Sequence, residues 1–327
     1  MNVKSELLRI FSENPSDYVS GEELAKRLSV SRNAVWKAVQ SMRGEGYHIS
    51  AVTNKGYRLD SNADVVSAQA ISACFRNPGI FHVEFRKSVD STNTALREMA
   101  DRANLAEGFV LAADGQSAGK GRRGRGFFSP PGHGIYFSIL LKIGNKTVDA
   151  ALITALAAVA ASMAIEEIMG ITTGIKWVND LYLNNKKVCG ILTEAVYDME
   201  SGRIETAVLG IGINVTTPPG GYPHELKDIV TALTDKHTAA NNERCRLIAA
   251  TLDNFMEHYR NLSELNFLNE YRKRSIIIGR EVDVVSLDGS TKKAQVLKID
   301  DRCGLVVKYK DGKTATLTSG EVRIVGF

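Results

Sequence analysis

The sequence has few cysteines and little net charge. Its four cysteines lie far apart and form no CxxC pair, so neither a zinc site nor a disulfide framework is expected. Free thiols in a reducing compartment are the simplest interpretation. The net charge of +4 comes from 41 basic and 37 acidic residues. That balance does not by itself indicate a nucleic-acid partner, because the distribution of charge matters more.

Signals for export and for a membrane are also lacking. Glu6 and Arg9 interrupt the first apolar residues, which argues against an ordinary signal peptide. The longest apolar stretch, from Ala150 to Met163, is too short to span a bilayer. The composition, 44% hydrophobic and 24% charged over 327 residues, allows more than one globular core. We therefore expect a soluble cytoplasmic protein that has no membrane contact.

Residues 1–62 have the order of elements of a winged helix-turn-helix. A first helix around residues 7–11 is followed by Ser20-Gly21-Glu22-Glu23, a capping box that opens a second helix. Apolar residues at helical spacing predict a third helix from Arg32 to Arg43. Alternation from Ile49 to Leu59 around Asn54-Lys55-Gly56 predicts a small hairpin.

Residues 64–275 mix strands with helices and follow the polar linker Ser61-Asn62-Ala63-Asp64. The expected strands are His82–Arg86, Phe109–Ala113, Ile135–Leu141, Gly174–Trp177, Val188–Ala195 and Ala207–Val215. The expected helices are Ser91–Ala103, Asp149–Met169 and Asn242–Asn261. Because regular crossovers are few, the pattern indicates an α+β domain with a mixed sheet rather than a doubly wound one.

Residues 276–327 contain short strands separated by tight turns. The expected strands are Glu281–Ser286, Lys292–Asp300, Leu305–Tyr309 and Lys313–Thr318. Asp288-Gly289 and Asp311-Gly312 are the turn signals between them. This pattern favours a small SH3-like β-barrel.

The N-terminal segment is locally basic. Between Lys26 and Arg58 there are seven basic residues and one acidic residue, Glu45. Recognition helices read base edges with residues near their N-terminus, and Arg and Asn there suit guanine and adenine. The candidate DNA-binding residues are Ser31, Arg32, Asn33, Lys37, Lys55 and Arg58. A winged helix used for protein contacts is the alternative, but the basic wing favours DNA.

The centre of the chain carries a basic, glycine-rich loop. Gly119-Lys120-Gly121-Arg122-Arg123-Gly124-Arg125 places four positive charges in seven residues without an acid. Glycines let backbone N–H groups converge on an anion, and arginines offer forked donors to phosphate or carboxylate. The loop lacks the GxxxxGK[ST] pattern, and its glycines do not form a GxGxxG fingerprint that follows the strand of a βαβ unit. A flexible surface loop is the alternative, although its place between apolar strands argues against it.

Three further motifs accompany this loop. Asp90-Ser91-Thr92-Asn93 opens a helix, where hydroxyls and an amide suit a small polar group. Lys176-Trp177-Val178-Asn179-Asp180 precedes a second run, Lys187-Val188-Cys189-Gly190-Ile191-Leu192. Gly210-Ile211-Gly212-Ile213-Asn214-Val215 is a glycine-bearing strand that a ligand or backbone can approach closely. Taken singly, these motifs also fit a plain N-cap, a hairpin with solvated lysines and a β-bulge.

Together, the four motifs in this order resemble the biotin–protein ligase family. The similarity covers all three segments and is strongest from Ser88 to Val215. It resembles the bifunctional members, which join a winged helix to a ligase of the class II synthetase-like type and repress biotin synthesis genes. The resemblance implies ATP-dependent formation of biotinyl-5′-AMP and transfer of biotin to a lysine of the biotin carboxyl carrier protein of acetyl-CoA carboxylase. It also implies binding to biotin operator DNA, a homodimer when the adenylate is bound, and Mg²⁺ as a companion of ATP.

The resemblance also implies roles for individual residues. Arg122 and Lys187 would be catalytic. Biotin would be bound by Ser91, Thr92, Asn93, Gln116, Lys120, Gly121, Arg122 and Lys187. The nucleotide would be bound by Arg122, Arg123, Arg125, Phe128, Asn179, Lys187 and Asn214. Asp180 falls on the position associated with magnesium.

Two residues depart from the family pattern, and two other functions stay open. Val178 stands where the family has proline, which would stiffen the turn. Phe127 replaces a tryptophan often seen after the loop, which keeps stacking area and loses the indole N–H. A lipoate–protein ligase shares the catalytic fold, although the Gly-Arg-Arg-Gly-Arg loop and the N-terminal segment favour biotin. A transcription factor that only senses a metabolite is the other alternative.

Overall fold

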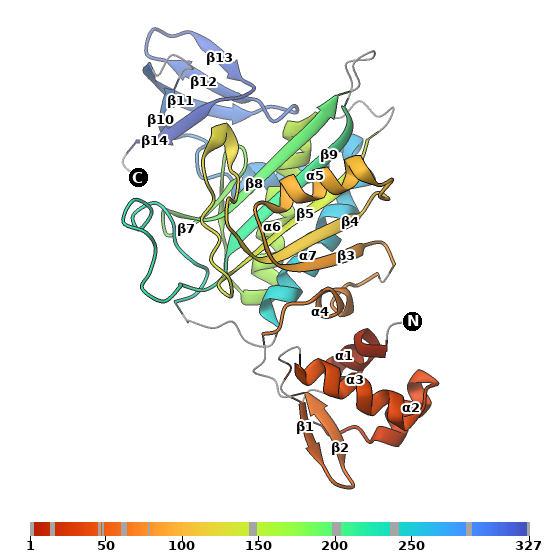
Figure 1. Ribbon diagram of the computed structural model, residues 1–327. Helices are drawn as coiled ribbons and strands as arrows, with labels where there is room; N and C mark the ends of the chain where they lie inside the picture. Colours follow the sequence, from red (N-terminus) through yellow and green to blue (C-terminus); the bar gives the residue numbers. More distant parts are fainter. Residues whose placement is uncertain are drawn as a thin grey trace.

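The computed structural model describes residues 3–13, 17–44, 47, 49–59, 64–77, 79–143, 149–197, 204–235, 242–285 and 290–325. The N-terminal helices lie below the central sheet, and the C-terminal strands lie beyond its other end (Figure 1). Three features singled out from the sequence fall outside the described residues: Glu45, most of the linker (Ser61 to Ala63) and the turn Asp288-Gly289.

The N-terminal head, defined as α1 to β2, is the winged helix-turn-helix that the sequence predicts. Its elements are α1 (Val3–Glu13), α2 (Gly21–Leu28), α3 (Arg32–Gly44), β1 (Ile49–Val52) and β2 (Gly56–Leu59). The Ser20 hydroxyl accepts a hydrogen bond from the Glu23 amide at 3.1 Å, so the predicted cap forms. The Arg43 guanidinium donates to the Ile49 carbonyl oxygen, which ties the third helix to the wing.

The central part contains a seven-stranded mixed sheet of order β3-β4-β5-β9-β8-β7-β6. Its strands are β3 (His82–Val89), β4 (Phe109–Gln116), β5 (Gly134–Lys142), β6 (Gly174–Lys176), β7 (Asp180–Leu183), β8 (Lys186–Tyr197) and β9 (Ile204–Asn214). Only the β3–β4 pair is parallel among the described pairings. The α+β class with a mixed sheet is therefore confirmed.

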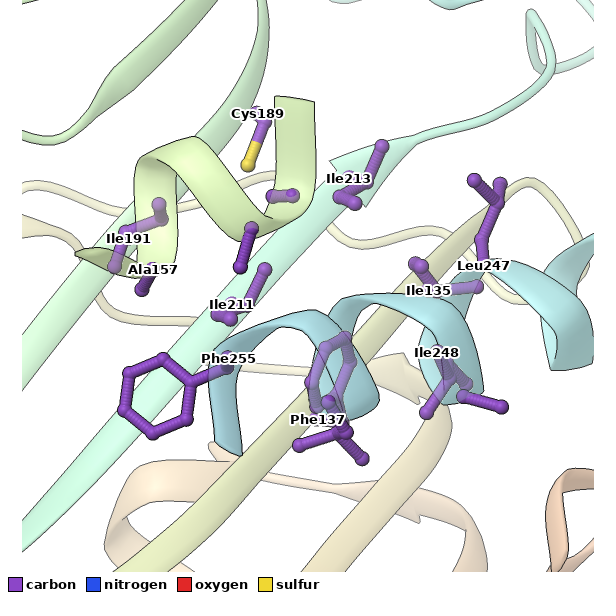
Figure 2. Packing of buried hydrophobic residues seen from close by; sticks show 14 of the residues in the cluster. Ile135, Phe137, Ala157, Cys189, Ile191, Ile211, Ile213, Leu247, Ile248 and Phe255 are labelled. Carbon is purple, nitrogen blue, oxygen red and sulfur yellow. The ribbon is translucent and has the colours of Figure 1, made fainter. Parts of the chain in front are cut away.

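The pleat of this sheet separates core residues from site residues. Helices α6 (Ala150–Met169) and α7 (Glu243–Tyr259) cover one face, where Ile211 and Ile213 of β9 are buried (Figure 2). Helix α5 (Thr92–Arg102) packs on the other face in a separate cluster that includes Val208. Because successive strand residues point to opposite faces, the glycines of the Gly-Ile-Gly-Ile run face the α5 side.

One helix among the described residues, α6, is long and apolar enough to cross a membrane. Of its most apolar window, 67% is buried. The buried residues pack in the same cluster as α7 and the central sheet. That burial is typical of the core helix of a globular domain rather than a membrane span.

The sequence left several short elements unpredicted. Helix α4 (Ala68–Ala73) is too short for a periodic signal, and it lies between the head and the sheet, against α1 and β3 (Figure 1). Half of the residues of helix α8 (Phe267–Arg274) are charged. Such segments are fixed by tertiary packing rather than by local propensity.

The C-terminal part is a five-stranded antiparallel sheet of order β13-β12-β11-β10-β14. Its strands are β10 (Glu281–Val285), β11 (Thr291–Ile299), β12 (Leu305–Tyr309), β13 (Thr314–Leu317) and β14 (Glu321–Ile324). The Trp177 indole N–H donates to the Cys303 carbonyl oxygen at 2.7 Å, which fastens this sheet to the central part. The closed SH3-like barrel and the domain boundaries drawn from the sequence stay predictions.

A buried arginine joins the segment that follows the head to strand β4 of the central sheet. The guanidinium of Arg244, on α7, is 8% exposed and pairs with Asp64 and, at 2.7 Å, with Asp114 of β4. Burial would favour loss of its proton, but the two carboxylates outweigh that effect and raise the pKa of Arg244. Asp114 also accepts from the Gly132 amide at 3.2 Å, so one cation holds three segments.

Arg244→Ala should lower the free energy of unfolding by about 3 kcal/mol, because it leaves two partly buried carboxylates without their cation. Urea denaturation followed by circular dichroism measures this change. The matched control is Arg246→Ala, on the exposed side of the same helix, which should change stability by less than about 0.5 kcal/mol. Equal effects of the two variants would contradict the role given to the Arg244 pairs.

Candidate active site

The basic loop between β4 and β5 is closed on itself by backbone hydrogen bonds. The Gly121 amide donates to the Arg125 carbonyl at 2.7 Å, and the Phe127 amide donates to the Gly119 carbonyl at 2.8 Å. Between them Arg123 adopts a left-handed conformation with φ of 57°, which is unfavourable for a residue with a side chain. The two hydrogen bonds and the conformation of Arg123 thus give the loop a defined backbone shape.

The loop lies on a part of the sheet that glycines leave bare. Gly190 of β8 pairs with Gly212 of β9, and the Phe127 ring lies over both. A Cβ on Gly212 would sit 2.6 Å from Phe127 Cε1, and one on Gly190 would sit 3.0 Å from Cε2. Any larger residue at Gly212 would displace the ring, so glycine here is required by close approach.

A small cavity of about 40 Å³ lies at the N-terminus of α5. Ser91 is the N-cap but makes no capping bond with its side chain. Instead, Gln116 Oε1 accepts from the Thr92 amide at 2.8 Å. Gln116 Nε2 in turn donates to the Ser129 hydroxyl at 2.8 Å. The hydroxyl and amide groups at this helix start therefore line a polar pocket, as their position predicts.

The floor of this cavity holds a polar network that the sequence analysis missed. The Ser138 hydroxyl, fully buried in β5, donates toward Asn93 Oδ1 at 2.6 Å. Asn93 Nδ2 donates to Glu194 Oε2 at 2.8 Å, and Asn93 Oδ1 fills the space above Gly210. A lone serine inside the apolar strand Gly134–Lys142 was the signal, because buried hydroxyls need partners.

A larger cavity of about 680 Å³ adjoins the first. It is rimmed by cations of the loop and of β6 to β8, and by aromatic rings. Phe128 meets Tyr222 edge-on, with ring centroids 6.1 Å apart. Burial raises the pKa of Tyr222 to about 12, so its hydroxyl is further from ionising at neutral pH than that of an ordinary tyrosine. The mixture of cations and aromatic faces suits a nucleotide, whose phosphates and base need both.

Five residues line both cavities and therefore mark the junction between them: Gly121, Arg122, Phe127, Asn179 and Lys187. At this junction Arg122 Nη1 donates to Asn179 Oδ1 at 3.1 Å. The ammonium of Lys187 lies 2.7 Å from Asp180 Oδ1. Asn179 is held by its own Nδ2, which donates to the Ile191 carbonyl at 2.9 Å. Two cations thus stand where an anion from each cavity would meet.

The structure gathers the residues that the sequence singled out. The proposed biotin residues all line the small cavity: Ser91, Thr92, Asn93, Gln116, Lys120, Gly121, Arg122 and Lys187. The proposed nucleotide and metal residues all line the large one: Arg122, Arg123, Arg125, Phe128, Asn179, Asp180, Lys187 and Asn214. Their proximity agrees with those roles, which stay predictions.

The large cavity also contains residues that sequence reasoning missed. Lys176 and Tyr182 line it as a pair, with Lys176 Nζ donating to the Tyr182 hydroxyl at 3.2 Å. The C-terminal strand β14 contributes Val322 and Arg323. No linear pattern links residues so distant in sequence, so only the folded chain reveals this contribution.

Val178, which replaces the family's proline, lies in a well-held turn. The Trp177–Val178 peptide is cis, and the Tyr271 hydroxyl donates to the Val178 carbonyl at 3.0 Å. The Trp177 indole is fixed to Cys303 as described above. Neighbouring side chains therefore hold this turn, which a proline at position 178 would stiffen.

The candidate DNA-binding residues lie together on the head. Ser31, Arg32, Asn33 and Lys37 are exposed along the start of α3, and Lys55 is exposed at the tip of the wing. The Ser31 hydroxyl accepts from the Ala34 amide at 3.1 Å, so it also caps the helix. Arg58 lies over the ring of Tyr18, 4.7 Å from its centroid.

Comparison with known proteins identifies two families in this chain. Residues 85–214 match the biotin/lipoate A/B protein ligase family, and residues 3–58 match a helix-turn-helix domain. The chain is 34% identical to the bifunctional ligase/repressor BirA of Bacillus subtilis over 314 residues, which cover 95% of each chain. It is 30% identical to BirA of Escherichia coli over 199 residues, covering 61% of this chain and 60% of that one.

A solved structure supports the same assignment. The biotin protein ligase from Aquifex aeolicus, in complex with biotin and ATP, superimposes with a TM-score of 0.61 at 29% identity. The match covers 74% of this chain and 98% of that chain. The chain therefore belongs to the biotin/lipoate A/B protein ligase family, as a biotin–protein ligase preceded by a helix-turn-helix domain.

Proposed function

We propose that the small cavity binds the rings of biotin, that the large cavity binds ATP, and that the two react at the junction. The observation that carries this proposal is the set of residues shared by both cavities, with Arg122 and Lys187 at its centre. A carboxylate leaving the small cavity and an α-phosphate in the large one would both face these cations. Neutralising both anions is what their approach requires.

Binding of biotin needs the loop to adjust. A volume of about 40 Å³ holds roughly three water molecules, since one water needs about 10–15 Å³ of such space. A fused ring system needs more. Phe127, which lies over Gly190 and Gly212, is the side chain whose displacement would enlarge the cavity. We propose that the loop opens for biotin and closes again over the bound adenylate.

The reaction proceeds in two steps. A biotin carboxylate oxygen forms a bond to the α-phosphorus of ATP, and pyrophosphate leaves with the electrons of the broken phosphoanhydride bond. A lysine amine of the acceptor protein then attacks the acyl carbon, and AMP leaves as the amine loses its proton. The protein's contribution is positioning and charge neutralisation, without a covalent enzyme intermediate. Lys187 would bridge carboxylate and phosphate, and Arg122 would fold the loop over the adenylate and exclude water.

The site fits a magnesium ion carried by the nucleotide rather than a protein cage. No group of three or more metal-ligating side chains occurs among the residues that the structure describes. Mg²⁺ usually takes one or two carboxylates together with substrate phosphates. Asp180 lines the large cavity beside Lys187 and would be its protein ligand. The ion would supply charge neutralisation at the phosphates.

Biotin is favoured over lipoate because the similar ligase of Mycobacterium tuberculosis and the similar structure from Aquifex aeolicus are both named for biotin. A pyrophosphate-exchange assay with ATP and either biotin or lipoate separates these functions. Biotin-dependent exchange is expected. Exchange with lipoate alone would make the chain a lipoate ligase, and exchange with neither would favour the metabolite-sensing factor.

We further propose the biotin carboxyl carrier protein of acetyl-CoA carboxylase as the acceptor, and biotin operator DNA as the partner of the head. Incubation with biotin, ATP and purified acceptor, followed by mass measurement of the acceptor lysine, tests the first. The adenylate-bound chain would form a two-fold dimer on a palindromic site, the geometry expected of a helix-turn-helix. The cytoplasmic location of the protein stays a prediction from the sequence.

Lys187→Ala should lower the rate of biotin-dependent pyrophosphate exchange by about 10²–10³-fold, because one preorganised cation at the reacting phosphate is lost. Initial rates at saturating biotin and ATP measure the effect. Lys186→Ala is the matched control, since Lys186 donates to the Lys227 carbonyl and lines neither cavity. An unchanged rate for Lys187→Ala would remove this residue from the catalytic role.

Arg122→Gly should release biotinyl-5′-AMP into solution, because the loop loses its bond to Asn179 and no longer holds the mixed anhydride. Free adenylate, and biotin on lysines of an added bystander protein, are the readouts. Arg122→Lys, which keeps the charge but not the forked donor, should leak less. If Arg122→Gly kept its acceptor specificity and leaked no adenylate, loop closure by Arg122 would be refuted.

A further inference from the structure

The head exposes a large aromatic side chain on its third helix. Trp36 is 50% exposed, and Val52 on the wing is 40% exposed. They are the large hydrophobic residues that remain exposed among the described residues of the head. The chain has only two tryptophans, and the other, Trp177, is 5% exposed. Exposed aromatic rings of this size are enriched where a partner covers them.

Trp36 lies on the exposed, polar face of α3. At 100° per residue, Arg32, Asn33, Trp36, Lys37 and Gln40 fall within an arc of about 140°. All five are exposed. Val35, Val39 and Met42 are buried on the rest of the helix. The ring therefore projects between Arg32 and Asn33, on the side of the exposed arc that is nearer to the buried face.

The surroundings of Trp36 indicate the chemistry of its partner. The head carries described basic residues on three elements: Lys26 and Arg27 on α2, Arg32 and Lys37 on α3, and Lys55 and Arg58 on the wing. The acidic residues of α2 lie in the first turn of that helix. One of them, Glu23, is paired with Arg27. A polyanion complements such a surface, whereas a second copy of this basic face would be repelled.

We propose that Trp36 contacts base edges in the major groove and contributes to the sequence specificity of the head. This inference rests on the proposed binding of the head to DNA and adds a residue to it. The apolar group offered in the major groove is the 5-methyl of thymine. The ring would cover that methyl group while Arg32 and Asn33 form hydrogen bonds beside it. Trp36 would thus read A·T pairs, and Lys37 would hold phosphate without reading sequence.

The test uses the full chain with biotin and ATP, and a duplex recovered by binding from a randomised pool. An unrelated duplex of the same length measures non-specific binding. Trp36→Ala should weaken binding to the selected duplex by about tenfold, as expected for an interfacial tryptophan. It should leave the unrelated duplex, the ligase rate and the melting temperature unchanged. Lys37→Ala is the matched comparison, because it should weaken both duplexes and lower the salt dependence.

A double-mutant cycle identifies the contacted base. Each thymine of the selected duplex is replaced in turn by uracil, which removes only the 5-methyl group. At the contacted position, removal of the methyl group should weaken DNA binding by the wild-type chain. The same removal should cause no further loss of affinity in Trp36→Ala, which already lacks the ring. The loss of affinity for Trp36→Phe should lie between the losses for the wild-type chain and for Trp36→Ala. Tryptophan fluorescence, taken as the difference between wild type and Trp36→Phe, should be quenched by the selected duplex.

Three results would overturn the proposal. Equal weakening of both duplexes by Trp36→Ala would make Trp36 a general contact without specificity. An altered monomer–dimer equilibrium of Trp36→Ala without DNA, with unchanged affinity once dimerised, would assign the ring to a second copy. If the wild-type chain selected no duplex while its ligase assay succeeded, the DNA-binding function itself would fail, and the ligase function would stand.

Discussion

The close approach of the basic loop to the central sheet is the constraint on which the rest of the site depends. Phe127 rests on Gly190 and Gly212 because those residues have no side chain. This contact fixes where the loop crosses strands β8 and β9, and so where Arg122 meets Asn179. Interiors are packed too densely for the ring to lie there above any larger residue. Gly190 and Gly212 therefore determine where the loop places the guanidinium of Arg122.

The pleat of the sheet makes this arrangement possible without weakening the core. Alternate residues of β9 are isoleucine on the α6–α7 face (Figure 2) and glycine on the α5 face. The same strand thus packs tightly on one side and leaves the other side open to Phe127 and Asn93. A shift of one residue in register would bury the glycines and fill the site with isoleucine. Core stability and site geometry are therefore specified by one alternating pattern.

The two cations at the junction of the cavities are each held by a neighbouring polar side chain. Lys187 lies against Asp180, and Arg122 against Asn179, so both cations are positioned in the absence of substrate anions. Such preorganisation lowers the cost of arranging charge during the reaction. Arg244 extends this order outward, because it joins Asp64 to Asp114. Asp114 in turn accepts from the Gly132 amide, and these two residues flank the segment that contains the loop. The segment that follows the head is thereby attached to β4, the strand that precedes the loop.

Local patterns in the sequence were sufficient to predict the winged helix, the long helices and the mixed sheet. A family resemblance added many, though not all, of the residues that line the two cavities. Hydrophobic periodicity and capping residues act over a few positions, so they are readable without a structure.

The tertiary structure alone decided which residues support the site from a distance. Ser138 and Glu194 hold Asn93, Tyr271 holds the turn at Val178, and Arg323 reaches the large cavity from the last strand. These contacts join segments far apart in the chain, and no local propensity encodes them. Short elements such as α4 and α8 escaped prediction for the same reason, because their stability comes from packing against neighbours rather than from their own residues.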